Sequence, residues 1–310
     1  MTPSSRPPTA LACAWVAAAG LVTMGCARPP QAKVAVRPAS HDDSHDDVAP
    51  RAPSRIPFAL ATREDAIVRV VVAGRSSCSG TLVDEDLVLT AHHCVVKKSD
   101  AGELTPTKHR AEEITVELGG DDIAWGQVSV KHVVTPPCGH GGGRGDVAVL
   151  VLERKLVGVA TMPTRLDAPP HVVVAPQSQA PASLHAAMEA AVPNKAKHIA
   201  QADPIGFGRC ASSAGGVHRR ARTGGDIETV SSGTFRLKAS VCPGDSGGPV
   251  LLRGTQEIVG VMSMSAMDGD ERTAGMSIVA RIDAVRPVFA QARAIADGAS
   301  PAELPPISCP

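Results

Sequence analysis

Residues 242–249 of this 310-residue chain read Cys-Pro-Gly-Asp-Ser-Gly-Gly-Pro and say more about fold and function than any other stretch. Ser246 lies between glycines, which let a backbone bend sharply and approach a ligand closely. A serine hydroxyl becomes a good nucleophile only when a base takes its proton and donors await the oxyanion. Alone, this run could equally be a flexible turn, so its interpretation depends on partners elsewhere in the chain.

Two upstream segments supply such partners. The apolar run Leu87–Leu89 is followed by Thr-Ala-His-His-Cys, which places His93 in a short turn after an expected strand. Asp146 stands at the start of the buried-strand pattern Val147–Leu152. The order His, Asp, Ser along the chain is that of the chymotrypsin type of catalytic triad and differs from the orders on other folds.

These segments resemble the motifs of the trypsin/chymotrypsin family of serine proteases. Four further matches are Cys78–Leu82 with Cys-Gly-Gly-Ser-Leu, Leu89–Cys94 with Leu-Thr-Ala-Ala-His-Cys, Asp146–Leu150 with Asp-Ile-Ala-Leu-Leu, and Ile205–Gly208 with the Gly-Trp-Gly turn. Gly244–Pro249 matches the nucleophile motif letter for letter. Several ordered motifs over roughly residues 60 to 290 are a far more specific signal than any one of them.

Short Val-rich runs separated by turn residues indicate an all-β fold. They lie at Ile67–Val72, Thr81–Leu89, Ile114–Leu118, Gln127–Val134, Val147–Leu152, Val172–Val174, Thr234–Leu237, Val250–Leu252, Glu257–Ser263 and Met276–Ala280. The resemblance implies two six-stranded antiparallel β-barrels, the first carrying His93 and Asp146 and the second Ser246. Helical spacing of apolar residues over Ile282–Ala296 predicts a C-terminal helix, and the Ala-rich stretch 182–202 predicts a short surface helix ending before Pro193.

The resemblance also assigns roles to the site residues. Ser246 is expected to attack the substrate carbonyl, His93 to act as base and then acid, and Asp146 to orient the imidazole. The N–H groups of Gly244 and Ser246 are expected to form the oxyanion hole. His92 competes with His93 for the role of base, but the family's catalytic histidine directly precedes the cysteine, so we expect His92 to be structural.

For the substrate pocket, the resemblance places Ser240 at the base and Ser263, Met264 and Ser265 along the wall. Trypsin-like members carry an aspartate at the base to receive Arg or Lys, and a neutral serine argues against that pairing. Because Met264 is apolar and flexible, we predict a preference for uncharged, apolar residues at the P1 position. The alternative is that Asp268, Asp270 or Glu271 enters the pocket and restores basic specificity.

Activation departs from the family pattern. Family zymogens expose an Ile-Val-Gly-Gly-like N-terminus whose ammonium pairs with the aspartate before the nucleophile, here Asp245. This sequence lacks that motif, and Arg55-Ile56 is the nearest cleavable junction. We therefore expect cleavage after Arg55 to free Ile56 to reach Asp245, since an unpaired buried carboxylate would disorder the oxyanion loop.

Composition excludes several classes of protein. Lys plus Arg and Asp plus Glu both number 31, so the formal net charge is zero and nothing favours binding to nucleic acid or an anionic membrane. No motif calls for a cofactor or a metal. The His/Asp-rich tract 41–47 could hold a metal weakly, but a solvated tether is the simpler interpretation because nothing fixes its geometry. We expect a monomer.

The N-terminal region has the pattern of an exported protein. Residues 1–25 combine Arg6 with an apolar stretch too short for a membrane span, which predicts a signal peptide. Leu-Val-Thr-Met-Gly-Cys resembles a bacterial lipoprotein signal, with Cys26 as the lipidated residue and ordinary secretion as the alternative. We expect a linker or pro-segment at 26–55, the protease domain at 56–296 and a tail at 297–310, in a protein that is either lipid-anchored in the periplasm or at the cell surface, or secreted.

With Cys13 in the signal and Cys26 either lipidated or removed, an even set of six cysteines remains, as expected for an exported disulfide protein. The family pairs the positions of Cys78 and Cys94. The other four allow three connectivities, of which we favour Cys210–Cys242 with Cys138–Cys309.

The function that follows is a serine endopeptidase acting on polypeptides through an acyl-enzyme intermediate. A surface-tethered binding protein on an inactive or zymogen-locked protease scaffold is the alternative. An esterase or acyl transferase using the same triad is a third possibility, because the chemistry is shared.

Overall fold

The structure is a computed structural model that describes residues 62–119, 124–137, 139–170, 200–210, 219–265 and 275–309. The predicted signal peptide, Cys26, Ile56, the run Val172–Val174 and nearly all of the Ala-rich stretch lie outside these residues. Within the described part, no helix is both long and apolar enough to span a membrane.

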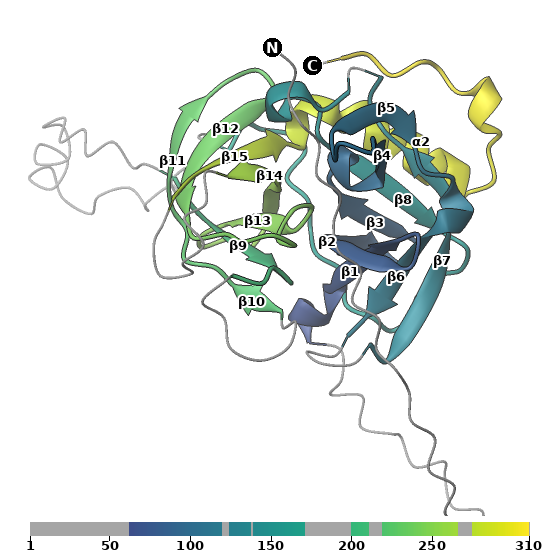
Figure 1. Cartoon of the computed structure of the whole chain (residues 1–310), viewed down its shortest axis with the longest axis horizontal. Coiled ribbons are helices and arrows are strands. Elements are labelled where there is room, and N and C mark those ends of the chain that lie inside the picture. The colour runs from purple at the N-terminus through teal and green to yellow at the C-terminus, as the bar shows by residue number, and fades with distance from the viewer. Residues whose placement is uncertain are drawn as a thin grey trace, which may run out of the picture. The chain divides into compact units, whose positions relative to one another are not determined.

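The first half of the chain forms a closed antiparallel barrel of six strands in the order β1-β2-β3-β8-β7-β6 (Figure 1, blue and teal). Its strands are β1 Ile67–Val72, β2 Arg75–Asp84, β3 Leu87–Thr90, β6 Ile114–Leu118, β7 Gly126–Val134 and β8 Ala148–Leu152. A short hairpin of β4 Val96–Lys98 and β5 Leu104–Lys108 stands apart from the barrel. Full closure leaves this barrel without an exposed edge.

The second half repeats the architecture (Figure 1, green and yellow). Its strands are β9 Gln201–Gly206, β10 Arg220–Ala221, β11 Gly225–Val230, β12 Thr234–Ala239, β13 Pro249–Leu252, β14 Ile258–Ser265 and β15 Gly275–Arg281. Six of them run β9-β11-β12-β15-β14-β13, and the pairing of β13 with β9 closes the ring. Strand β10 is appended to β9 at its Gly206 end. The predicted fold of two six-stranded antiparallel barrels is confirmed.

Each barrel interior is filled by aliphatic side chains, as a sequence without Tyr and with four Phe requires. In the first barrel, β3 and β8 are buried along their whole length and read as continuous apolar runs. In the second barrel, β12 alternates buried and exposed side chains, with Phe235 and Leu237 fully buried. This period-two alternation is typical of a strand with one face in the core and one in solvent.

The helix α2, Arg286–Ala296, buries Val288, Phe289, Ala292 and Ile295 in the first barrel's core cluster. These residues recur at helical spacing, so the predicted C-terminal helix is present, beginning four residues later than expected. Its exposed face carries Arg293, whose guanidinium reaches Asp84 at 2.8 Å and Asp86 at 2.7 Å. The tail beyond it packs Leu304 and Ile307 against the same core.

One expected strand was too long. The stretch Thr81–Leu89 is two strands, β2 and β3, that turn at Glu85 and Asp86 and pair with each other. The turn contains neither Gly nor Pro, which is why the sequence alone did not reveal it.

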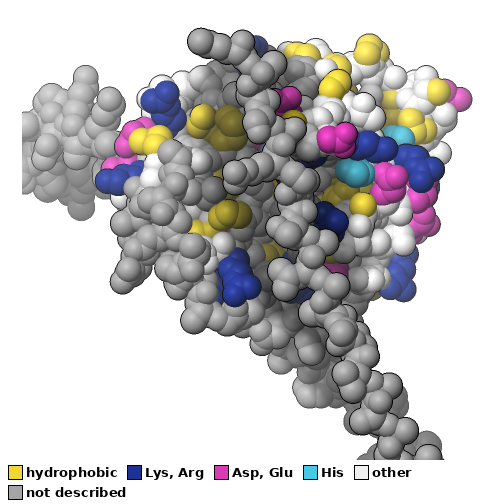
Figure 2. Space-filling view, in the orientation of Figure 1, with side chains coloured by type: hydrophobic (Ala, Val, Ile, Leu, Met, Phe, Trp, Pro, Cys, Tyr) yellow, Lys and Arg dark blue, Asp and Glu magenta, His cyan; other side chains and the backbone are white. Residues whose placement is uncertain are grey.

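On the surface, basic and acidic side chains lie interspersed on the face shown in Figure 2, in keeping with the balanced charge.

Candidate active site

His93 lies in the short 3₁₀ turn η2, His92–Val95, immediately after the buried strand β3. The disulfide Cys78–Cys94 fastens this turn to β2, so the residue after His93 cannot move independently of the barrel. The His93 side chain is 18% exposed, which leaves one edge of the ring accessible. The sequence expectation of a histidine on a fixed turn at the end of a strand is met.

Asp146 approaches His93 from the loop before β8. Its Oδ2 lies 2.7 Å from His93 Nδ1, and its Oδ1 accepts the backbone N–H of His93 at 2.8 Å. Burial, at 1% exposure of the carboxylate, by itself raises the pKa of Asp146. The hydrogen bonds from His93 and Ser263 outweigh burial and hold that pKa below its ordinary value, so the carboxylate is ionised.

Ser263, which was expected along the pocket wall, contacts the Asp146 carboxylate. It is 4% exposed, and its hydroxyl donates to Asp146 Oδ2. Ser263 lies on β14 of the second barrel, whereas Asp146 belongs to the first, so this hydrogen bond joins the two barrels at the site. Gly143 permits the approach, because a Cβ there would lie 3.2 Å from Ser263 Oγ and 2.8 Å from Ile278.

Ser246 is half-buried in the loop before β13. Gly244 and Gly247 on either side have φ of +100° and +81°, a left-handed conformation that favours glycine. Ser246 O accepts the N–H of Ser79 at 2.8 Å, and Gly247 N–H donates to Met262 O at 2.8 Å. Within the described residues, the N–H groups of Gly244 and Ser246 donate to no acceptor. Both predicted oxyanion donors are therefore available to a ligand.

The described residues hold no hydrogen bond between Ser246 Oγ and the His93 ring. His93 Nε2 instead lies 3.7 Å from Cys94 Sγ. Catalytic hydrogen bonds in ligand-free sites are often long and tighten when substrate binds. The described contacts therefore join His93 to Asp146, and the role of Ser246 as nucleophile stays a prediction.

The carboxylate before Ser246 has a cation that the sequence did not predict. Asp245 is 1% exposed, and its Oδ2 lies 2.8 Å from Arg222 Nε, in a side chain that is itself 3% exposed. The backbone N–H groups of Cys242 and Gly208 each donate to the same carboxylate at 2.8 Å. Arg222 and these amides lower the pKa of Asp245, but burial raises it by more, so the pKa lies above its ordinary value. Ile56, the expected partner, lies outside the described residues.

His92 is buried, and its ring meets that of His140 edge to face with centroids 5.3 Å apart. Burial lowers the pKa of His92, which keeps the imidazole neutral. Its ring makes no contact with Asp146 of the kind that His93 makes. This placement agrees with a structural role for His92.

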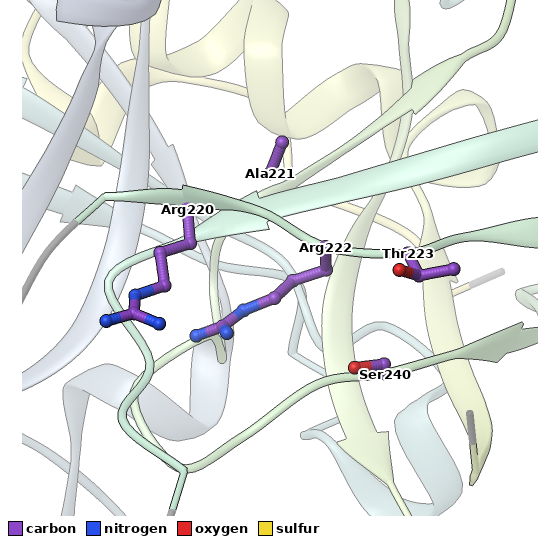
Figure 3. Close-up of a pocket in the computed structure, with 5 residues that line it drawn as sticks. All are labelled: Arg220, Ala221, Arg222, Thr223 and Ser240. Atoms are coloured by element: carbon purple, nitrogen blue, oxygen red, sulfur yellow. The ribbon is translucent and has the colours of Figure 1, made fainter. Parts of the chain in front are cut away.

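The four residues expected to form the substrate pocket differ in exposure and in their contacts. Ser240 is buried and borders a cavity of about 390 Å³ with Arg220, Arg222 and Thr223 (Figure 3). Figure 3 shows both guanidinium groups pointing to the same side of their strand and Ala221 to the other. Met264 is 41% exposed, and Ser265 shares a hydrogen bond of 2.9 Å with Ser277.

The residues that were expected to modify the pocket, Asp268, Asp270 and Glu271, lie outside the described residues. Ser246, Ser263 and Met264 do not border the cavity beside Ser240.

Two of the three predicted disulfides, Cys78–Cys94 and Cys210–Cys242, are confirmed. A second disulfide joins Cys210 to Cys242, three residues before Asp245, and Cys309 is also disulfide-bonded. Cys138, the expected partner of Cys309, lies outside the described residues. Cys78, His93 and Cys94 bring three potential metal-ligating atoms within 4.8 Å of one another, but both sulfurs are already bonded in a disulfide. This cluster is therefore not a thiolate metal site.

Two contributors to the site were missed by sequence reasoning, Arg222 and Ser79. Both act through contacts between distant parts of the chain, and Arg222 belongs to no motif. The resemblance carried a signal for Ser79, because the family motif has glycine where this chain has serine. An unexpected hydroxyl in a motif that otherwise matches marks a position worth inspecting.

Comparison with known proteins agrees with this geometry. A family model described as Trypsin matches residues 60–289. The fold is similar to that of neuropsin, a serine protease expressed in the limbic system of mouse brain, with a TM-score of 0.50 at 16% identity, covering 75% of this chain and 95% of neuropsin. An atomic resolution structure of HBP is similar at a TM-score of 0.51 and 15% identity, covering 77% of this chain and 95% of HBP. These likenesses show the fold, and no curated protein matches the sequence.

Proposed function

The chain belongs to the trypsin family, and on this premise we propose that it is a serine endopeptidase that uses Ser246, His93 and Asp146. One observation carries the proposal: the buried Asp146 holds His93 by both Nδ1 and the backbone N–H, in a loop system where two amides beside Ser246 await an acceptor. A merely structural serine turn has no need of this combination.

The proposed reaction begins when Ser246 Oγ attacks the carbonyl carbon of a peptide bond and His93 Nε2 takes the hydroxyl proton. Asp146 fixes the imidazole tautomer, and the Gly244 and Ser246 amides stabilise the oxyanion. Loss of one such donor costs about 2.7–4 kcal/mol in comparable sites. The C–N bond then breaks as His93 returns its proton to the leaving amine, and water hydrolyses the acyl ester.

We propose that Arg222 takes the part that a new N-terminal ammonium plays in family zymogens. The ion pair of Arg222 with Asp245 supports this, because it neutralises the buried carboxylate without any cleavage. A guanidinium is permanently charged, so the pair does not depend on processing. This ion pair favours the hypothesis of an enzyme that is active as soon as it folds, and it disfavours the hypothesis of a zymogen-locked binding protein. An enzyme whose activity rises with cleavage after Arg55, and whose mature chain begins at Ile56, would contradict it.

For substrates we propose polypeptides with an uncharged, apolar residue at P1. Support comes from the neutral Ser240 at the base position and the exposed, apolar Met264 nearby. The alternative of basic specificity depends on Asp268, Asp270 or Glu271. A library of peptides that vary only at P1 decides between them, and cleavage confined to Arg and Lys would overturn the apolar preference.

We propose that the protein is exported and lipidated at Cys26. The disulfides support export, because such bonds persist in oxidising compartments. Metabolic labelling with a palmitate analogue should mark the wild type and not Cys26→Ala. Labelling of neither, with both proteins in the medium, would indicate ordinary secretion.

The decisive experiment is labelling of the signal-free protein with a fluorophosphonate probe beside Ser246→Ala. In this reaction Ser246 Oγ bonds to phosphorus, fluoride leaves, and His93 takes the proton. Labelling that disappears in Ser246→Ala is expected. Absence of labelling in the wild type, before and after limited trypsin treatment, would favour the binding protein. Cleavage of small esters without any cleavage of peptides would favour the esterase.

A further inference from the structure

Ser79 is a buried hydroxyl in the first barrel whose bonds reach into the second. It lies on β2 directly after Cys78 and has no exposed surface. The trypsin family motif that this segment resembles has glycine at this position, so the side chain is a feature of this chain and not of the motif. A fully buried hydroxyl is costly unless its hydrogen bonds are made.

The Ser79 hydroxyl makes two hydrogen bonds, both to the second barrel. Ser79 Oγ donates to Gly244 O at 2.7 Å and accepts the Phe207 N–H at 2.8 Å. Its proton and one lone pair are therefore used, and both partners are backbone groups of loops that surround Asp245. Because each partner is a backbone group, the hydroxyl fixes the path of the chain and not merely a side chain.

The Ser79 backbone extends the connection. Its N–H donates to Ser246 O at 2.8 Å, and its carbonyl accepts the Thr90 hydroxyl at 2.8 Å. The carbonyls of Gly244 and Ser246 are thus both held by Ser79, one through the side chain and one through the main chain. Thr90 in turn fixes Ser79 to the strand that leads to His93.

Fixing these two carbonyls bears directly on the oxyanion donors. Gly244 has φ of +100°, and a glycine there can rotate more freely than any other residue. The hydrogen bond from Ser79 restrains the peptide that follows Gly244. The Gly244 N–H belongs to the preceding peptide, whose carbonyl, Pro243 O, accepts the Arg209 N–H at 2.9 Å. With the peptides on both sides held, the rotation of Gly244 between them is limited. Along the chain, the Ser246 N–H lies between the carbonyls of Gly244 and Ser246, both of which Ser79 holds.

We propose that Ser79 is a positioning residue for the oxyanion hole, whose hydroxyl fixes the peptide that follows Gly244 and so limits the rotation of Gly244 about its own φ and ψ. The inference rests on the proposed function of Ser246. Since removal of an oxyanion donor lowers kcat by 10²–10³ in comparable sites, loss of its support should lower the rate of acylation by about tenfold to a hundredfold. Ground-state binding should be unaffected, because Ser79 touches no substrate.

The test measures the rate of fluorophosphonate labelling at 10 °C, together with kcat and KM for p-nitrophenyl acetate. The variants are Ser79→Ala, Ser79→Thr, which retains the hydroxyl, and Thr81→Val as control. Thr81 lies two residues along the same strand and is equally buried, but its hydroxyl has no hydrogen-bond partner. Its removal should leave labelling within about twofold of wild type. Circular dichroism establishes that each variant is folded at the assay temperature.

The expected result is a Ser79→Ala protein with labelling and kcat reduced at least tenfold and KM unchanged, and a Ser79→Thr protein within about threefold of wild type. If a folded Ser79→Ala protein is labelled as fast as the wild type, the inference is overturned and the proposed function stands. If Ser79→Ala does not fold, Ser79→Thr decides, and tenfold slower labelling of the folded Thr variant would overturn the inference. Absence of labelling in every protein, the wild type included, would instead refute the proposed function and with it this inference.

Discussion

Two regions of this molecule place an aspartate under nearly identical conditions and use it differently. Asp146 and Asp245 each have 1% of their side chain exposed, and each accepts hydrogen bonds from backbone N–H groups. The region around Asp146 completes the pair with the imidazole of His93, whereas that around Asp245 uses the guanidinium of Arg222.

The difference teaches that the partner, more than the burial, decides what a buried carboxylate does. An imidazole can gain and lose a proton, so the Asp146 region can take part in proton transfer. A guanidinium keeps its charge, so the Asp245 region can only hold its loop in place. The directions of the two carboxyl pKa values differ accordingly, lowered for Asp146 and raised by burial for Asp245.

The largest effect should come from a substitution in the region around Asp146. Asp146→Asn retains the shape of the side chain but favours the wrong imidazole tautomer, and we expect kcat to fall by about 10⁴ with the fold intact. Steady-state kinetics on a peptide substrate, with circular dichroism as the check on folding, measures this. Activity within tenfold of wild type would mean that Asp146 does not orient the base.

A substitution in the region around Asp245 should mainly lower the free energy of unfolding. Arg222→Met leaves Asp245 as a buried, unpaired charge, and we expect a loss of about 3–5 kcal/mol in unfolding free energy. The double variant Arg222→Met with Asp245→Asn should recover much of that loss. Urea titration of the single and double variants measures both. Equal stability of wild type and Arg222→Met would contradict the role given to the ion pair.

A smaller effect should follow at the hydrogen bond that links the barrels at Asp146. Ser263→Ala removes a bond to an ionised carboxylate, and such bonds contribute about 1.5–3 kcal/mol. We expect a loss of that size in thermal unfolding and a fall of about tenfold in kcat. Thr81→Val, which removes a buried hydroxyl without a partner, is the matched control and should change neither. A Ser263→Ala protein indistinguishable from this control would show that the bond is not made in solution.

The smallest effect is expected at a third carboxylate, that of Asp86, which lies outside the regions around Asp146 and Asp245. Hydrogen bonds from Arg293 lower the pKa of Asp86 in the folded protein. A lowered folded pKa means that the stabilisation is present above about pH 4 and is lost as pH falls through the folded value. Asp86→Asn should therefore cost about 1 kcal/mol at pH 7 and progressively less below pH 4. Urea titrations at pH 7 and pH 3 measure this, and a cost that grows on acidification would reverse the sign.

The sequence was informative wherever a residue sits inside a motif and poor wherever it acts across the fold. Short motifs sufficed for the two-barrel fold and for the segments that carry His93, Asp146 and Ser246. The contact of Arg222 with Asp245 could not be predicted, because nothing local to Arg222 distinguishes it from other arginines. The hydrogen bond of Ser263 to Asp146 could not be predicted either, because the face of a strand on which a residue lies depends on register, which a bulge in β14 between Met262 and Met264 alters.

Strand β9 was missed for a similar reason. Pro204 lies within it and pairs with Val250, although proline in a run argues against a strand interior. The barrel closes through this pairing, so the tertiary structure overrides the local preference. The β2–β3 turn shows the converse, since Glu85 and Asp86 reverse the chain with neither Gly nor Pro.

The two described disulfides have a consequence for the timing of biosynthesis. One lies beside both Ser79 and His93, and the other lies two residues before Gly244. The turn that carries His93 and the loop before Ser246 are therefore each fastened by a bond that persists in oxidising compartments. A newly made chain in a reducing cytoplasm lacks these two bonds, so under the proposed function and export the site is completed only after the chain has left.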